Sequence, residues 1–165
     1  MKVIVGIDQS AYWRQVIQNV CDRHWPAATE FKILTVIQPF QWEHCHTPAW
    51  EHSAYEIRLA RIGAARKLLS DAKALLESKV AGAKVEIELE HGNAGDHIAQ
   101  SARAWPADKI IVGAHHHSPA GKLGSVPRTL MHNATCSLEL VELERLAPES
   151  LATPPRVDAV AKVVI

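Results

Sequence analysis

The chain lacks a net charge, because 18 Lys and Arg balance 18 Asp and Glu among its 165 residues. Proteins that bind nucleic acid or an anionic membrane surface usually carry a basic excess, so this balance argues against both kinds of partner. Long apolar segments are also lacking, since no stretch approaches the roughly 20 apolar residues of a membrane span. The amino terminus, MKVIVGID, is too short in apolar residues for a secretory signal. We therefore expect a cytoplasmic protein.

Cysteines are few, and known catalytic signatures are lacking. The three cysteines, Cys21, Cys45 and Cys136, are odd in number and far apart, so we expect reduced thiols rather than a disulfide framework. No nucleophile elbow of the form G-x-S-x-G occurs. The Gly-Lys pair at 121–122 is not a phosphate-binding P-loop, because Leu123 follows it and the upstream glycine spacing is missing. The sequence therefore offers no catalytic set.

Short β-branched runs alternate with helical patterns along most of the chain. Apolar or alternating runs predict strands at 3–7, 31–37, 84–90, 109–112 and 137–143, and the alternation at 84–90 favours an edge strand with one wet face. Apolar residues at helical spacing predict helices over about 13–21, 51–80, 96–105 and 126–134, the second with one stripe formed by Tyr55, Leu59, Ile62, Leu69, Leu76 and Val80.

Strands that alternate with helices predict one α/β domain over residues 1–146. It should hold a five-stranded parallel sheet with helices on both faces, a Rossmann-like three-layer sandwich. Residues 147–165 contain three prolines followed by an apolar end. We interpret them as a linker and a tail that either pairs with a sheet edge or is disordered.

Tryptophan is frequent for this length, with five in the chain. Trp13 and Trp105 lie on the apolar faces of predicted helices, where we expect core positions. Trp42 and Trp50 follow the second strand, and we expect them to close that loop, with covering a ligand as the alternative.

Ligands of open parallel sheets bind outside the carboxyl ends of the strands, where the strand order reverses. Asp8 ends the first strand, where an acid can accept a hydrogen bond from a ribose hydroxyl or cap the following helix. The loop GAHHHSPAGKLGSV at 113–126 contains glycines that can expose backbone N–H groups to a phosphate. A helix that starts at Ser125 adds an anion-binding N-terminus, which the serine hydroxyl can cap. An ordinary helix start is the alternative for residues 124–127.

Histidines in two loops offer a metal site as a second interpretation. His115, His116 and His117 are consecutive, and neighbouring residues of an extended loop point alternately, so they rarely bind one ion together. The loop after the second strand holds further N and S ligands for zinc or copper, namely His44, Cys45, His46 and His52. Their spacing fits no strong zinc signature, and a metal-binding module stays an alternative.

Four segments resemble the universal stress proteins. They are VIVGIDQS at 3–10, KILTVIQP at 32–39, HGNAGDHIAQSARAWPADKIIVGA at 91–114 and GSVPRTLMHNATCSLELVE at 124–142. The resemblance covers about residues 2–143 and implies an adenine nucleotide alpha hydrolase-like fold. It also implies a cytoplasmic stress-response regulator, dimeric through the strand Ser137–Leu143, that binds ATP or AMP and has at most slow ATP hydrolysis.

The family's nucleotide-binding branch carries a first Gly, two residues, a second Gly, nine residues, and then Gly with Ser or Thr. Gly113 matches the first glycine and Gly124 with Ser125 the closing pair. His116 stands in place of the second glycine, and only seven residues separate it from Gly124. The altered loop leaves open whether phosphates are still held, so a dimeric interaction protein without nucleotide is the alternative. The resemblance implies the following contacts with ATP or AMP, with or without Mg²⁺: Ile7, Asp8, Val36, Val112, Gly113, His115, His116, Gly124, Ser125 and Val126.

Overall fold

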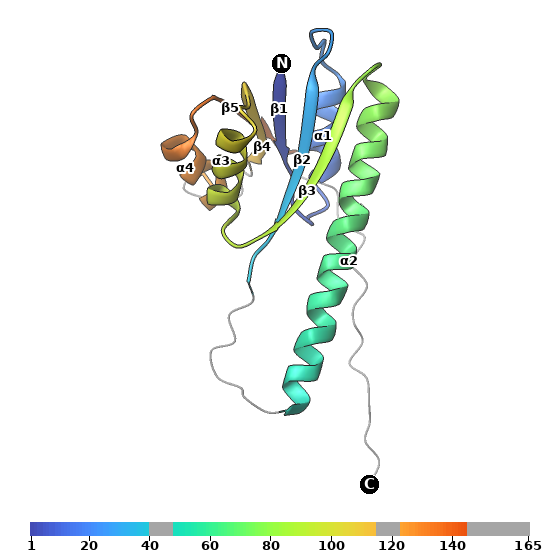
Figure 1. The fold of residues 1–165 in the computed structure, drawn as a ribbon, viewed down its shortest axis with the longest axis vertical. Helices are drawn as coiled ribbons and strands as arrows, with labels where there is room; N and C mark the ends of the chain where they lie inside the picture. The colour runs from blue at the N-terminus through green and yellow to red at the C-terminus, as the bar shows by residue number, and fades with distance from the viewer. Residues whose placement is uncertain (40–47, 115–122, 145–165) are drawn as a thin grey trace.

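The structure, a computed structural model, describes residues 1–39, 48–114 and 123–144. Strands and helices alternate in the predicted order (Figure 1). They are β1 (Lys2–Gly6), α1 (Trp13–Cys21), β2 (Glu30–Ile37), α2 (Pro48–Lys79), β3 (Lys84–His91), α3 (Ala94–Ala104), β4 (Lys109–Ala114), α4 (Ser125–Asn133) and β5 (Ser137–Glu142). The predicted linker and tail at 147–165 lie outside the described residues.

The five strands form one parallel sheet in the order β3-β2-β1-β4-β5. This confirms the predicted five-stranded parallel sheet. The chain proceeds outward from β1 through β2 to β3, and then returns to the other side of β1 with β4 and β5. The strand order therefore reverses between β1 and β4, and a ligand site is expected outside the carboxyl ends of these two strands.

The two faces of the sheet carry separate apolar clusters, as a side-chain period of two requires. Val3, Val5 and Ile111 pack with residues of α1 and α2 on one face. Ile4 and Ile110 lie in the cluster that α3 and α4 cover on the other. Figure 1 shows the long α2 beside β3 and the pair α3 and α4 across the sheet. The result is the three-layer sandwich that the sequence predicts.

Helix α2 is longer than the sheet that it covers. Its 32 residues correspond to about 48 Å of helix, whereas an eight-residue strand spans about 26 Å. The N-terminal half of α2 therefore extends beyond the sheet (Figure 1). In the predicted stripe, Leu69 and Leu76 are buried but Tyr55 is 60% exposed and Leu59 is 49% exposed. No helix in the described part of the chain is long and apolar enough to cross a membrane.

Strand β3 lies at the edge of the sheet, as its alternating pattern predicts. Of its apolar residues, Val85 is buried but Ile87 is 45% exposed. The charged face is in part covered by α3, because the Ser101 hydroxyl donates to Glu88 at 3.1 Å and Lys32 pairs with the same carboxylate at 2.9 Å. The face of β3 that was predicted to be solvent-exposed thus holds an ion pair beneath α3.

Two of the cysteines are free and half-buried at the margin of the core, as expected of reduced thiols. Burial raises the pKa of the Cys21 thiol, and Asp22 adds to this effect. Burial also raises the pKa of Cys136, with a further contribution from Asp108. Lys79 opposes this effect at Cys21 but does not outweigh it, so both thiols are protonated near neutral pH, which disfavours their reactivity. Cys45 lies outside the described residues.

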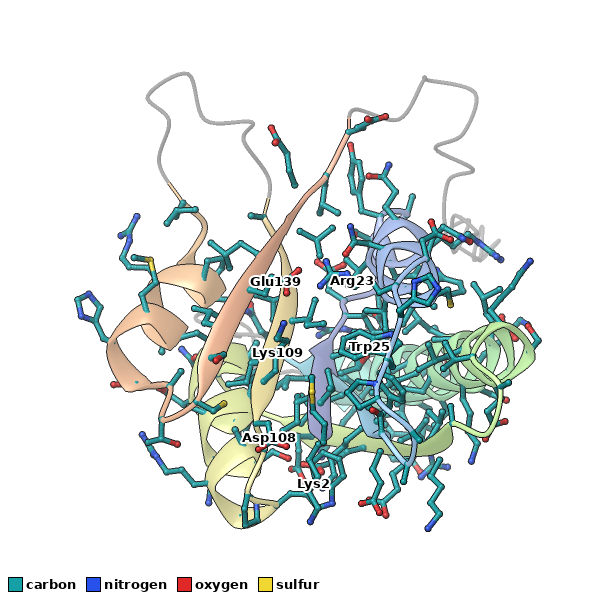
Figure 2. All side chains as sticks on the ribbon, turned by 90° about the horizontal axis from the view of Figure 1, so that it is seen from above. Lys2, Arg23, Trp25, Asp108, Lys109 and Glu139 are labelled. Carbon is teal, nitrogen blue, oxygen red and sulfur yellow. The ribbon has the colours of Figure 1, made fainter. Side chains whose placement is uncertain are left out.

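Glu139 on β5 forms an ion-pair cluster between strands and helix (Figure 2). Its carboxylate pairs with Arg23, which follows α1, and with Nζ of Lys109 on β4 at 3.1 Å. The Arg23 hydrogen bond is the main cause that lowers the pKa of Glu139, and Lys109 contributes, against the opposing effect of burial. The folded-state pKa lies below the unfolded one, so the cluster stabilises the fold above the unfolded pKa and is lost as pH falls through the folded value.

Replacing Glu139 with Gln is therefore expected to lower the free energy of unfolding by about 1 kcal/mol at neutral pH, since the two cations lose their carboxylate. The difference from the unaltered protein should disappear below the folded-state pKa, where Glu139 is protonated as well. Urea unfolding at neutral pH and at successively lower pH, until the two proteins no longer differ, measures both values. Glu86→Gln, on the exposed edge strand β3, is the control and should change little. A difference that persists at acid pH would rule out the ion-pair explanation.

Candidate functional site

A cavity of about 280 Å³ lies at the carboxyl ends of β1 and β4, where the strand order reverses. Segments that are far apart in the sequence line it, from the end of β1 to the residue after β5. The lining residues are Gly6, Ile7, Asp8, Tyr12, Trp13, Val16, Leu34, Val36, Gln38, Ala94, Ile98, Val112, Gly113, Gly124, Ser125, Val126, Pro127 and Leu143.

The sequence-predicted site residues that the structure describes all line this cavity. They are Ile7, Asp8, Val36, Val112, Gly113, Gly124, Ser125 and Val126. His115 and His116 lie outside the described residues. The topology thus brings the ends of β1, β2 and β4 and the start of α4 to one place, while contact with a ligand stays a prediction.

Asp8 is held at the rim of the cavity by the end of β1. The Ile7 N–H donates to the Leu34 carbonyl at 3.0 Å, and the buried Thr35 hydroxyl donates to the Ile7 carbonyl at 3.0 Å. Oδ1 of Asp8 accepts from the backbone N–H of Ser10 at 3.0 Å and from the Ser10 hydroxyl. Asp8 thus closes the turn at Ser10 and does not cap α1, which has no side-chain cap. Both bonds use Oδ1, so Oδ2 is the oxygen that can accept from a ligand.

The N-terminus of α4 lies against the same cavity, and no side chain caps it. Gly124 is the N-cap residue, so the expectation that the Ser125 hydroxyl caps the helix is wrong. Among the described residues, no acceptor binds the backbone N–H groups of Ser125 and Val126, and Pro127 has none to donate. The first turn of α4 therefore presents two amide donors, together with the partial positive charge of a helix N-terminus.

An apolar and aromatic wall completes the cavity on the side of α1. Trp13 is half-buried, packs against the apolar cluster beneath α1 and α2 and also lines the cavity, so it stands at the margin of the core rather than deep within it. The Arg14 guanidinium lies 4.5 Å from its ring centroid. Val16 and Leu143 line the same side. The sequence analysis missed this wall. Its only sequence signal is that α1 begins close behind Asp8.

Trp105, the other tryptophan expected in the core, ends α3, is half-buried and packs against the apolar cluster that α3 and α4 cover. The Nζ atoms of Lys2 and Lys32 lie 5.1 and 5.0 Å from its ring centroid. Its indole thus makes cation–π contacts with two lysines on the face of the sheet that α3 covers. It does not line the cavity. Trp42 lies outside the described residues, as does the side chain of Trp50.

Gly113 at the end of β4 is half-buried and lies against two apolar side chains. A Cβ at this position would lie 2.8 Å from Cδ1 of Leu143 and 3.2 Å from Cγ2 of Val16. Gly113→Ala is therefore expected to cost about 1–2 kcal/mol of stability through overpacking. Gly63 lies in helix α2, and a Cβ added there would meet no atom of another part of the protein within 4 Å. Gly63→Ala should therefore be neutral or stabilise the fold by up to about 1 kcal/mol. Urea unfolding compares the two variants, and equal stabilities would contradict the packing of Leu143 on Gly113.

The described part of the chain contains no candidate metal site. Residues 1–39, 48–114 and 123–144 hold no group of three His, Cys, Asp or Glu residues that could bind an ion. The proposed ligands, His44, Cys45, His46 and residues 115–117, lie outside that part. His52 belongs to α2, but its side chain is outside the described set as well.

Known proteins share this architecture. The profile described as the Universal stress protein family matches residues 1–142. No curated protein sequence matches the chain. A universal stress protein UspA from Lactobacillus plantarum is similar in structure, with a TM-score of 0.67, 21% identity, and coverage of 86% of this chain and 97% of that one.

Two further solved structures of this fold contain adenine nucleotides. A universal stress protein family protein from Arabidopsis thaliana with AMP bound has a TM-score of 0.62 at 16% identity, over 94% of this chain and 97% of that one. The universal stress protein from Archaeoglobus fulgidus in complex with dAMP has a TM-score of 0.53 at 17% identity, over 87% and 98%. These likenesses show the fold, and the family profile spans nearly all of it. The chain therefore belongs to the universal stress protein family.

Proposed function

We propose that this protein binds an adenine nucleotide, AMP or ATP, in the cavity at the carboxyl ends of β1 and β4. The observation that carries the proposal is the position of Asp8 and of the uncapped N-terminus of α4 on the same cavity. One group accepts hydrogen bonds and the other donates them, as a ribose and a phosphate require. That AMP and dAMP occupy relatives of the same fold supports the choice of an adenine nucleotide.

The chemistry of the cavity suits the three parts of a nucleotide. Ile7, Val36 and Val112 supply an apolar surface for a flat base. The Asp8 carboxylate accepts from ribose hydroxyls. The amides of Ser125 and Val126 donate to a phosphate oxygen at the helix N-terminus. The lack of a nucleophile elbow in the sequence supports a binding protein rather than an enzyme.

The outer edge of β5 supports the proposal of a homodimer. Among the described strands β5 pairs only with β4, so β5 is an edge strand to which a strand of a second copy could be added. We place the dimer contact at Ser137–Leu143, and we assign the protein a regulatory, cytoplasmic role in the stress response on the basis of its family. One observation favours a dimeric protein without nucleotide, because the packing of Leu143 explains Gly113 without any ligand.

Isothermal titration of the purified, nucleotide-free protein with AMP and ATP tests the proposal. Saturable heat and a rise in melting temperature are expected, and GMP should bind at least about 10-fold more weakly if the base is recognised. Neither heat nor a thermal shift at millimolar AMP or ATP would favour the nucleotide-free alternative.

A further inference from the structure

We propose that the cavity recognises the nucleoside part of its ligand, so that it binds adenosine and AMP in preference to ATP. This inference rests on the proposed function and names the ligand class of the same site. Its specificity-determining residues are Asp8, Trp13 and Leu143, all of which line the cavity. Three observations support the inference separately: the size of the cavity, the fixed position of its wall at Leu143 and the charge of the residues that line it.

The cavity is small for a triphosphate. Its volume of about 280 Å³ lies just below the range of about 300–1,000 Å³ that ligand pockets usually have. The space beside the end of β4 is taken by side chains, because Leu143 packs on Gly113 from one side. Trp13 and Val16 extend the same wall. A ligand thus finds room between Asp8 and α4 but meets apolar atoms beside Gly113.

The wall is fixed by hydrogen bonds on both sides of Leu143. Its own N–H donates to the Ala114 carbonyl at 3.2 Å. The Gln15 side chain then binds both backbone groups of Glu144, by accepting from its N–H at 2.9 Å and donating to its carbonyl at 3.0 Å. Leu143 cannot leave the cavity by a backbone shift without loss of these bonds. The backbone that carries Leu143 is therefore held in place, and the side chain itself is buried.

The charge at the cavity favours a ligand with few phosphates. Within residues 1–39, 48–114 and 123–144, Asp8 is the only charged residue that lines it. Two exposed arginines lie nearby. The Arg14 guanidinium lies 4.5 Å from the ring centroid of Trp13, and the Arg128 guanidinium is hydrogen-bonded to the Leu123 carbonyl at 3.1 Å. A helix N-terminus offers the equivalent of roughly half a positive charge, which suits one phosphate group better than three. Each added phosphate increases the repulsion from Asp8.

Titration calorimetry with adenosine, AMP and ATP, all without Mg²⁺, tests the inference directly, because Mg²⁺ would neutralise part of the phosphate charge of ATP. AMP should bind at least about 10-fold more tightly than ATP, and adenosine should bind more tightly than ATP as well. ATP binding as tight as AMP binding, or tighter, overturns the inference and leaves the proposed function standing. No binding of any of the three overturns both.

Salt dependence distinguishes an apolar site from one in which basic residues hold the phosphates. Raising NaCl from about 50 to about 500 mM should leave the affinity for adenosine unchanged and should not weaken ATP binding, because screening reduces its repulsion from Asp8. An ATP affinity that falls several-fold over this range would show that cations hold the phosphates, and would overturn the inference.

Leu143→Ala tests the wall, with the volume-conserving Leu143→Met as its control. The alanine variant should raise the ATP-to-AMP affinity ratio about 5- to 10-fold, because it opens space beside Gly113. The methionine variant should leave the ratio unchanged. Asp8→Asn should raise the ratio of ATP to adenosine affinity by removing the repulsion, with no change of volume. Unchanged ratios in both folded variants would overturn the assignment of these residues.

Discussion

Replacing Asp8 with Ala is expected to weaken AMP binding about 10- to 100-fold, because ribose hydroxyls lose an ionised acceptor worth about 1.5–3 kcal/mol. The carboxylate lies at the rim of the cavity, and Oδ1 already holds the turn at Ser10. The substitution thus removes both the ligand contact and the local constraint that positions it. Isothermal titration with AMP measures the loss.

Asp8→Asn separates these two contributions. Its side-chain oxygen can still accept from Ser10, so the turn is kept while the charge is removed. AMP binding should fall less than in the alanine variant. Asp22→Ala is the control, because Asp22 lies at the opposite end of α1 and should not affect AMP affinity. If Asp8→Ala binds AMP as well as the unaltered protein, the proposed role of the carboxylate is wrong.

Replacing Phe31 with Ala should have the largest effect on stability, with a loss of about 3–5 kcal/mol of unfolding free energy. Phe31 is fully buried in the cluster beneath α1 and α2. Its ring meets that of Trp25 edge-on, with centroids 5.2 Å apart and an interplanar angle of 89°. The substitution leaves a cavity and removes an aromatic contact. The melting temperature should fall by about 10 °C or more, as measured by thermal unfolding.

The same substitution should leave AMP affinity unchanged at a temperature where the variant is folded. Phe31 lies near the start of β2, whereas the cavity involves the end of that strand at Leu34 and Val36. Phe31→Leu keeps more of the apolar volume and serves if the alanine variant does not fold. A parallel loss of stability and AMP affinity in the folded protein would contradict the placement of the site.

The fold could be predicted because its physical causes are local. The run Val3–Ile7 is continuous and apolar, as burial on both faces of a parallel sheet requires. The alternation over 84–90 predicted an edge strand, and β3 is one. The exposure of Tyr55 and Leu59 could not be predicted, since helical spacing shows which residues share a stripe but not how far the sheet beneath it extends.

The site could be predicted only in part. Asp8 was expected at the cavity because it ends a strand, and Gly124 and Ser125 because a helix starts there. All three line the cavity, while their contact with a ligand stays a prediction. The wall could not be found this way, because Leu143 reaches the cavity through a long-range clamp between Gln15 and Glu144. Trp13 has the apolar spacing of a core residue, and only the position of α1 beside β4 turns it toward the cavity. The roles of His115 and His116 stay predictions.

A crystal structure of the protein with AMP tests the central claim most directly. We expect the base against Val36 and Val112, a ribose hydroxyl within about 2.5–3.2 Å of an Asp8 carboxylate oxygen, and the phosphate at the amides of Ser125 and Val126. AMP bound elsewhere, or a cavity that is empty at saturating AMP, would contradict the account.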